Sequence, residues 1–181
     1  MSKEIDKNGD FKKKLQAIKF LVLDVDGVMS DGKIGYMANG DEWKAFDAKD
    51  GAGVKYWVRA GHRAGIITGR SSPLVDRRAA ELDIEFVEQN AKSKLPVFMR
   101  MLGKAGVRPE EVAVMGDDIA DIPLIRAAGA GVAVADATEE TRDAALWVTK
   151  KNGGHGAIRE VIETILKVQG RWSGILERHL P

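Results

Sequence analysis

Two carboxylates stand one residue apart directly after an apolar run, and this pair is the strongest chemical signal in the sequence. Residues 20–23 have the length and composition of a buried strand, Asp24 and Asp26 follow, and Gly27 lets the chain turn away. A run that is apolar on both faces fits a parallel strand covered by helices on each side, and its carboxyl end is where open α/β sheets bind ligands. Because two carboxylates this close repel each other, a divalent cation is their natural partner.

Three further expected strand ends carry groups of a related kind. Thr68 ends a β-type run, Lys94 is a basic residue near another strand end, and Asp117 and Asp118 follow a third apolar run. Parallel strands would bring these groups to one edge of the sheet, and such a set suits Mg²⁺ and a phosphate. An aspartate can attack phosphorus, and an acid two residues away can protonate the leaving alkoxide and then activate water. The hydroxyl and ammonium would hold the phosphoryl oxygens.

Strand and helix patterns alternate along the rest of the chain. Asn39-Gly40 between two short alternating runs predicts a β-hairpin over residues 33–46, and Asp50 is expected to cap the helix that follows. Further strands are expected at 64–68, 84–87, 112–115, 131–135 and 146–148, with helices at 72–82, 93–102, 119–128, 138–145 and 157–169. These units predict a three-layer α/β sandwich around a mainly parallel, Rossmann-like sheet, with a β-hairpin insertion.

Length and composition narrow the class of protein. The 181 residues point to one domain, 18–170, between a charged N-terminal arm, 1–17, and a C-terminal tail, 171–181. With 28 basic and 27 acidic residues, nothing suggests nucleic acid or an anionic membrane as a partner. Cysteine is absent, and no signal peptide or membrane-spanning run is evident. We therefore expect a cytoplasmic protein.

Four motifs occur in order: Asp-Val-Asp-Gly from Asp24, Ile-Thr-Gly-Arg around Thr68, Lys94, and Gly-Asp-Asp-Ile-Ala-Asp around Asp117. Together they resemble the motifs of the haloacid dehalogenase-like phosphohydrolases. Stretches at 30–32, 44–46, 50–51, 132–137 and 153–154 make the chain more similar to one branch, the 3-deoxy-D-manno-octulosonate 8-phosphate phosphatases. The resemblance covers residues 18–170. It implies a capless fold and Mg²⁺-dependent hydrolysis of that sugar phosphate through an aspartyl-phosphate intermediate, a step of lipopolysaccharide precursor synthesis.

The resemblance implies a role for each matching residue. Asp24 would be the nucleophile and a metal ligand, and Asp26 the general acid/base, binding the metal through its carbonyl. Asp117 would be the third metal ligand. Thr68 and Lys94 would hold the phosphoryl group.

The resemblance also implies a set of substrate contacts. Besides Asp26 and Lys94, these are Asp47, Ala48, Lys49, Asp50, Gly51, Lys55, Arg70 and Arg78. An arginine can grip a carboxylate with two parallel hydrogen bonds, which suits an acidic sugar. Arg70 and Arg78 could instead form ordinary surface ion pairs.

Two positions depart from the pattern of the branch. Lys55 stands where the branch usually has arginine. Because lysine is only a point charge, the sequence does not decide which residues bind the substrate carboxylate. His155 stands where the tail motif usually has arginine, which is either a simple tolerated exchange or a contact that depends on pH. Asp118 and Asp121 would orient water or Lys94.

The hairpin has a second expected role. Neither the segment from Asp26 to Thr68 nor that from Lys94 to Asp117 has room for a separate cap domain, yet such a site works better with bulk water excluded. Hairpin 33–46 carries the large apolar residues Tyr36, Met37, Trp43 and Phe46. We expect hairpins of several subunits to pair and to close neighbouring sites. The resemblance implies a homotetramer.

Other interpretations remain at this stage. An enzyme alternative is a phosphatase of a related nine-carbon, sialic-acid-type 9-phosphate, and a non-enzyme alternative is a phospho-accepting receiver domain or a scaffold. Asp50 and Asp118 could be simple helix caps or turn residues. Lys92 competes with Lys94 for the phosphate-binding role, and we choose Lys94 because of the family motif.

Overall fold

Strand β1 (Phe20–Leu23) lies near the middle of a six-stranded sheet in the computed structural model, which describes residues 9–178. The strand order is β5-β4-β1-β6-β7-β8, and every pair is parallel. The other strands are β4 (Arg63–Ile67), β5 (Phe86–Glu88), β6 (Val112–Gly116), β7 (Ala130–Ala133) and β8 (Trp147–Val148). Because the chain steps to β4 on one side of β1 and to β6 on the other, the carboxyl ends of these three strands border one crevice.

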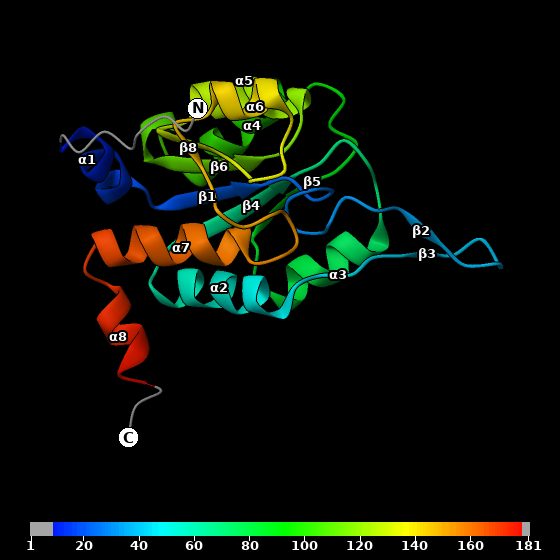
Figure 1. Cartoon of the computed structure of the whole chain (residues 1–181), viewed down its shortest axis with the longest axis horizontal. Coiled ribbons are helices and arrows are strands. Elements are labelled where there is room, and N and C mark those ends of the chain that lie inside the picture. The colour runs from blue at the N-terminus through cyan, green and yellow to red at the C-terminus, as the bar shows by residue number, and fades with distance from the viewer. Residues whose placement is uncertain (1–8, 179–181) are drawn as a thin grey trace.

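Helices cover both faces of this sheet and complete the expected three layers (Figure 1). One layer holds α2 (Ala48–Arg59), α3 (Pro73–Glu81) and α7 (Ala157–Val168), and the other holds α4 (Lys94–Ala105), α5 (Ile122–Ala127) and α6 (Glu139–Ala144). All four residues of β1 are buried, which is why the strand reads as a continuous apolar run. Among residues 9–178 no helix has both the length and the apolar character to cross a bilayer.

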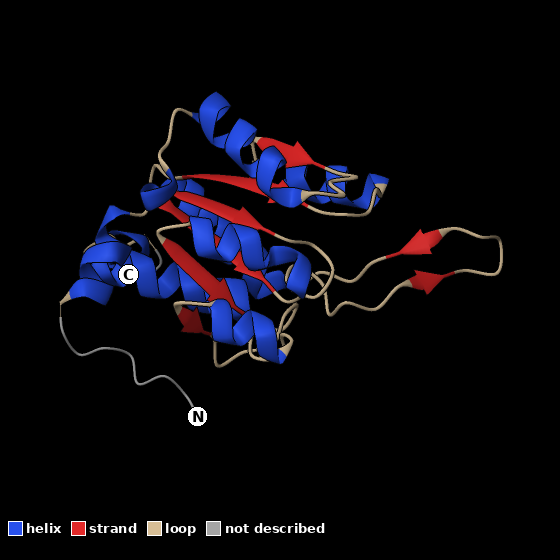
Figure 2. Cartoon of the chain, turned by 90° about the horizontal axis from the view of Figure 1, so that it is seen from above, coloured by secondary structure: helices blue, strands red, loops and turns tan. Residues whose placement is uncertain are grey.

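The predicted hairpin forms and reaches out from the body of the molecule (Figures 1 and 2). Its strands β2 (Gly35–Tyr36) and β3 (Glu42–Trp43) pair antiparallel. The turn between them contains Asn39, whose side chain bonds to Asp41, and Gly40, whose φ of 89° favours glycine. Tyr36, Met37 and Trp43 are 65%, 55% and 47% exposed, so the hairpin carries apolar surface that the single chain leaves uncovered.

The ends of the described chain are anchored on α7. The helical turn expected at the end of the charged arm is helix α1 (Asp10–Ala17), whose Leu15 is fully buried. The Gln169 side chain at the end of α7 donates to the carbonyls of Leu15 and Ile18. Helix α8 (Trp172–Leu176) forms the start of the expected tail. Residues 1–8 of the arm and 179–181 of the tail lie outside the described residues.

One expected helix cap is wrong. The N-cap of α2 is Asp47, whose carboxylate accepts from the amides of Lys49 and Asp50 at 2.6 and 2.9 Å. Asp50 lies inside the first turn of α2 and caps a different helix, because its carboxylate accepts from the amides of Gly156 and Arg159 at the start of α7. Both aspartates have the type and spacing of a cap, and only the tertiary packing of α2 on α7 decides between them.

Asp50→Ala should destabilise the fold more than Asp47→Ala does. Asp50 is 3% exposed, so its loss leaves the partly buried amides of Gly156 and Arg159 without this partner, at a cost of about 1–3 kcal/mol. Asp47 is a partly exposed cap, worth about 1 kcal/mol. Urea unfolding of both variants would measure the difference. Equal losses would contradict the view that Asp50 joins α2 to α7.

Candidate active site

A buried lysine links two of the acidic motifs. Lys94, the first residue of α4, donates to Asp24 Oδ1 at 2.8 Å and to Asp121 Oδ1 at 2.6 Å, and its side chain is only 7% exposed. Burial alone would lower the pKa of Lys94, but the attraction of Asp24 and Asp121 outweighs it and raises the pKa. The ammonium is therefore held as a cation directly beside Asp24. This placement is what a phosphoryl-binding lysine needs.

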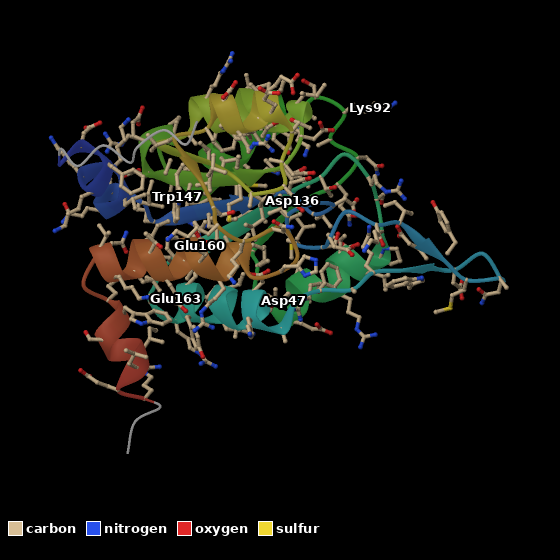
Figure 3. All side chains as sticks on the ribbon, viewed as in Figure 1. Asp47, Lys92, Asp136, Trp147, Glu160 and Glu163 are labelled. Carbon is tan, nitrogen blue, oxygen red and sulfur yellow. The ribbon has the colours of Figure 1, made fainter. Side chains whose placement is uncertain are left out.

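The competing lysine lies elsewhere. Lys92 is exposed and points away from the body of the molecule (Figure 3). The two-residue offset places Lys92 before α4 and Lys94 in its first turn, which faces the ends of β1 and β6.

Asp117 completes an acidic cluster with Asp24 and Asp121. One carboxylate oxygen of each residue lies within 4.8 Å of the others. Asp121 Oδ2 accepts from the amides of Asp117 and Asp118, and this fixes the loop after β6. Gly27 packs against Asp117 so closely that an added Cβ would lie 2.1 Å from Asp117 Oδ2. The cluster therefore stands directly beside the loop that follows β1.

The protonation of this cluster reflects its excess of negative charge. Burial raises the pKa of Asp24 to about 6 against the attraction of Lys94, and repulsion from Asp121 adds to the rise. Burial raises the pKa of Asp117 to about 7, with further contributions from Asp24 and Asp121. Three carboxylates share one ammonium, so a hard cation with oxygen ligands fits the charge and the chemistry of the donors. Asp24 and Asp117 are the residues that would hold it, since Asp121 is engaged with Lys94 and two amides.

These shifts predict how stability changes with pH in the absence of metal. Both folded-state pKa values are raised, so between about pH 4 and 7 the folded protein binds more protons than the unfolded chain. Stability should therefore fall as pH rises through this window. Asp117→Asn should flatten the fall, because it removes the larger shift. The change in melting temperature of the wild type and of Asp117→Asn between pH 4.5 and 8, with a chelator present, measures this fall. The same dependence on pH in both proteins would contradict the prediction. Added Mg²⁺ should restore stability mainly above pH 7.

Thr68 lies at the same edge of the sheet. It follows β4, is 3% exposed, and its hydroxyl accepts weakly from the amide of Arg70 at 3.4 Å. The neighbouring backbone holds it in place, because its carbonyl accepts from the amide of Ala91 at 3.0 Å. The structure thus brings Asp24, Thr68, Lys94 and Asp117 to adjoining strand ends, as the motif spacing predicts.

Asp26 stands apart from the acidic cluster and contacts the hairpin. Its Oδ1 accepts from Lys44 Nζ at 2.5 Å, and its Oδ2 lies 3.6 Å from Arg70 Nε. Glu42 pairs with both cations, at 3.4 Å in each case. Glu42 and Lys44 have no predicted site role, and Lys44 lies just beyond the end of β3. The one hint in the sequence is that Lys44 belongs to the stretch 44–46, which resembles the branch.

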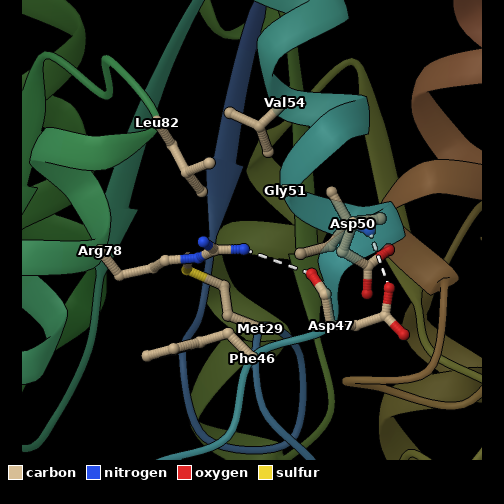
Figure 4. Close-up of a pocket in the computed structure, with 9 residues that line it drawn as sticks. Met29, Phe46, Asp47, Asp50, Gly51, Val54, Arg78 and Leu82 are labelled. Carbon is tan, nitrogen blue, oxygen red and sulfur yellow. Dashed lines mark hydrogen bonds between the residues drawn. The ribbon is translucent and has the colours of Figure 1, made fainter.

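The expected substrate contacts divide into two groups. Arg78 lies in a pocket with Phe46, Asp47, Gly51 and Met29 (Figure 4). Its guanidinium donates to the Asp47 carbonyl and lies 5.5 Å from the centre of the Phe46 ring. Its Nε is buried and has no hydrogen-bond partner, and it is the only such side-chain nitrogen or oxygen among residues 9–178. This pocket therefore contains a buried donor that no described residue satisfies.

Other expected contacts are directed elsewhere. Lys55 pairs with Asp83 at 2.5 Å on the surface between α2 and α3. The Asp50 carboxylate is occupied by α7, and Ala48 and Lys49 are exposed at the start of α2. Asp118 caps the short helix η2 (Ile119–Asp121) through the amide of Ile119, so the cap interpretation suits it.

Comparisons with known proteins agree with this geometry. Residues 84–162 match the family of haloacid dehalogenase-like hydrolases. The chain is 42% identical over 164 residues to the 3-deoxy-D-manno-octulosonate 8-phosphate phosphatase of Escherichia coli strain K12, covering 91% of this chain and 87% of that protein.

Solved structures show the same likeness. The enzyme of that name from Moraxella catarrhalis, solved with magnesium, phosphate and KDO, superposes with a TM-score of 0.93 at 39% identity, covering 96% of this chain and 99% of the other. The cobalt-bound phosphatase from Haemophilus influenzae gives a TM-score of 0.84 at 39% identity over 87% of this chain and 92% of that one. With its parallel sheet, its ordered aspartate motifs and relatives of this identity, the chain belongs to the haloacid dehalogenase-like hydrolases, in the branch of the 3-deoxy-D-manno-octulosonate 8-phosphate phosphatases.

Proposed function

We propose that this chain is a Mg²⁺-dependent phosphatase that hydrolyses 3-deoxy-D-manno-octulosonate 8-phosphate to the free sugar acid and phosphate. The observation that carries the proposal is the buried ammonium of Lys94 on the Asp24 carboxylate, with Asp117 beside it. A nucleophile, a phosphate-binding cation and a metal site then lie within one crevice. The Moraxella catarrhalis relative, whose structure holds magnesium, phosphate and KDO, supports the same substrate.

The reaction would proceed in two steps, transfer of the phosphoryl group to Asp24 and hydrolysis of the resulting ester. An Asp24 carboxylate oxygen bonds to phosphorus as the bond to the sugar oxygen breaks, and that oxygen takes its electron pair and a proton from Asp26. The Asp26 carboxylate then takes a proton from water, whose oxygen bonds to phosphorus as the Asp24 ester opens and phosphate leaves. Thr68 and Lys94 hold the phosphoryl oxygens throughout. Asp24, Asp117 and the Asp26 carbonyl would hold Mg²⁺, which would offset the charge on those oxygens.

The pocket around Arg78 suits the acidic end of the sugar. An arginine with a buried, unpaired Nε can form charge-assisted bonds to a carboxylate, and Phe46 fixes its plane. Lys55 pairs closely with Asp83 at 2.5 Å, whereas Arg78 reaches Glu81 only at 3.3 Å and keeps its Nε free, so we assign the carboxylate to Arg78. Arg78→Met should raise KM about tenfold or more for the carboxylated sugar phosphate and leave KM for a neutral sugar phosphate unchanged. Equal changes for both substrates would refute this assignment.

Phosphate release from a panel of sugar phosphates tests the proposal. The eight-carbon sugar-acid phosphate should be turned over many times with Mg²⁺ and not in the presence of EDTA. Faster turnover of a nine-carbon 9-phosphate would move the function to the sialic-acid-type alternative. A single stoichiometric phosphorylation without release would instead indicate a receiver domain.

We further propose that the protein is a cytoplasmic homotetramer. The exposed Tyr36, Met37 and Trp43 of the outstretched hairpin support assembly through the hairpins, since apolar surface of this kind marks a contact site. Light scattering should give four times the mass of the 19.7 kDa chain. A fully active monomer would overturn the assembly.

A further inference from the structure

A cluster of four charged side chains joins the base of the hairpin to the loop after β1. Lys44 Nζ contacts Asp26 Oδ1 at 2.5 Å and Glu42 Oε1 at 3.4 Å. Arg70 contacts Asp26 Oδ2 and Glu42 Oε1 from the other side, at 3.6 and 3.4 Å. Two cations and two carboxylates thus alternate, and each oxygen of Asp26 faces a different cation.

The Lys44 side chain is enclosed to an unusual degree for a hairpin lysine. Only 1% of it is exposed, whereas the side chain of Lys33 on the opposite arm is 80% exposed. A buried ammonium is costly unless it is paired, so Lys44 holds its place only with Asp26 and Glu42 beside it. Trp43, between Glu42 and Lys44, is half exposed. The hairpin therefore buries the Lys44 ammonium against Asp26 while the neighbouring Trp43 stays accessible.

The direction of the Asp26 carboxylate follows from this contact. Its neighbour Asp24 contacts a different cation, Lys94, and Asp26 has no carboxylate oxygen in the cluster of Asp24 with Asp117 and Asp121. Without Lys44, the Asp26 carboxylate would keep only the longer contact to the half-exposed Arg70. Lys44 is thus the closest group that fixes where the Asp26 carboxylate lies.

We propose that Lys44 is a positioning residue for the general acid/base Asp26, and that it couples the placement of the hairpin to proton transfer. This inference rests on the proposed phosphatase reaction. Lys44 acts through Asp26 and forms no bond with the phosphoryl group. Its effect therefore falls on protonation of the leaving oxygen and on activation of water, while attack by Asp24 on phosphorus stays intact.

The leaving group separates this role from a purely structural one. An alkyl phosphate needs the proton of Asp26 to leave, whereas p-nitrophenyl phosphate releases a stable anion without it. Lys44→Met should lower kcat/KM for the sugar phosphate about 100-fold and for p-nitrophenyl phosphate less than about threefold. Lys44→Arg should restore most of the sugar-phosphate activity, because it restores the cation. In Lys44→Met, water activation becomes slow, so p-nitrophenol should appear in a burst.

Lys33→Met is the matched control, since it removes an exposed hairpin lysine and should change neither rate. Light scattering on each variant shows whether assembly is retained. Equal losses on both substrates, or no loss on either, would overturn the proposal. If Lys44→Met does not fold, Glu42→Gln serves for the same comparison, because it removes the second carboxylate that holds Lys44. A ratio of sugar-phosphate to p-nitrophenyl-phosphate activity equal to that of the wild type would then refute the proposal. A wild-type protein that cleaves p-nitrophenyl phosphate but no alkyl phosphate refutes the proposed function instead.

Discussion

Asp24→Asn should abolish turnover, with a loss of roughly 10⁴-fold or more in kcat. The amide can still accept a hydrogen bond from Lys94, so the buried contact at the end of β1 persists and the fold is retained. It cannot attack phosphorus, and it binds Mg²⁺ less well than a carboxylate does. Steady-state phosphate release measures the loss, and mass spectrometry of acid-quenched protein should show no phosphoryl group on the variant.

Asp118→Asn is the matched control for this prediction. Asp118 is an acid of the same motif region, but its carboxylate caps η2, so the asparagine, also a good cap, should keep most of the activity. Equal losses in the two variants would mean that the acidic motif acts only through its overall charge. Residual phosphorylation in Asp24→Asn would remove Asp24 from the nucleophile's role.

Lys94→Met should cost both activity and stability. Its ammonium is the shared partner of the buried Asp24 and Asp121, and removing one member of a buried ion pair costs about 3–5 kcal/mol. The remaining carboxylates would repel one another more strongly, so the pKa of Asp24 should rise further and Mg²⁺ should stabilise the variant more than the wild type. We expect lowered thermal stability, partly restored by Mg²⁺, without recovery of phosphatase activity.

Lys92→Met provides the comparison for this result. It removes the same type of side chain two residues away from an exposed position, so stability should change by less than about 0.5 kcal/mol. Mg²⁺-dependent recovery of activity in Lys94→Met would contradict the assignment of Lys94 to the phosphoryl group. An unchanged melting temperature in Lys94→Met would contradict a stabilising role for the buried ion pairs of Lys94 with Asp24 and Asp121.

The layers and the central part of the site were predictable because local signals agree with the fold. The apolar run before Asp24 and the turn at Gly40 each specify their element through neighbouring residues. Parallel topology then brings Asp24 and Thr68 together without further information. The family motif was needed to prefer Lys94 over Lys92, since the two lysines stand only two residues apart at the start of the same helix.

Contacts between distant segments were not predictable from local pattern. Asp50 has the appearance of a cap for α2, but its partners are amides more than 100 residues later in the chain. Lys44 is a charged residue in an exposed-type hairpin, and nothing nearby in the sequence indicates that it is buried on Asp26. Lys55 pairs with Asp83, a residue with positive φ after α3. In each case a side chain's role depends on which helix or loop folds against it.

The link between Asp50 and α7 also bears on how the protein matures during translation. Most of the residues that line the pocket of Arg78 are made early, whereas the amides that secure Asp50, those of Gly156 and Arg159, are made only after more than four fifths of the chain. In a nascent chain released before Gly156, the Asp50 carboxylate would lack its two amide donors, and α2 would lack the helix it packs against. Formation of the pocket around Arg78 is therefore tied to near-completion of synthesis, and we expect a truncated product to lack the packing of α2 on α7 even with Asp24, Lys94 and Asp117 all present.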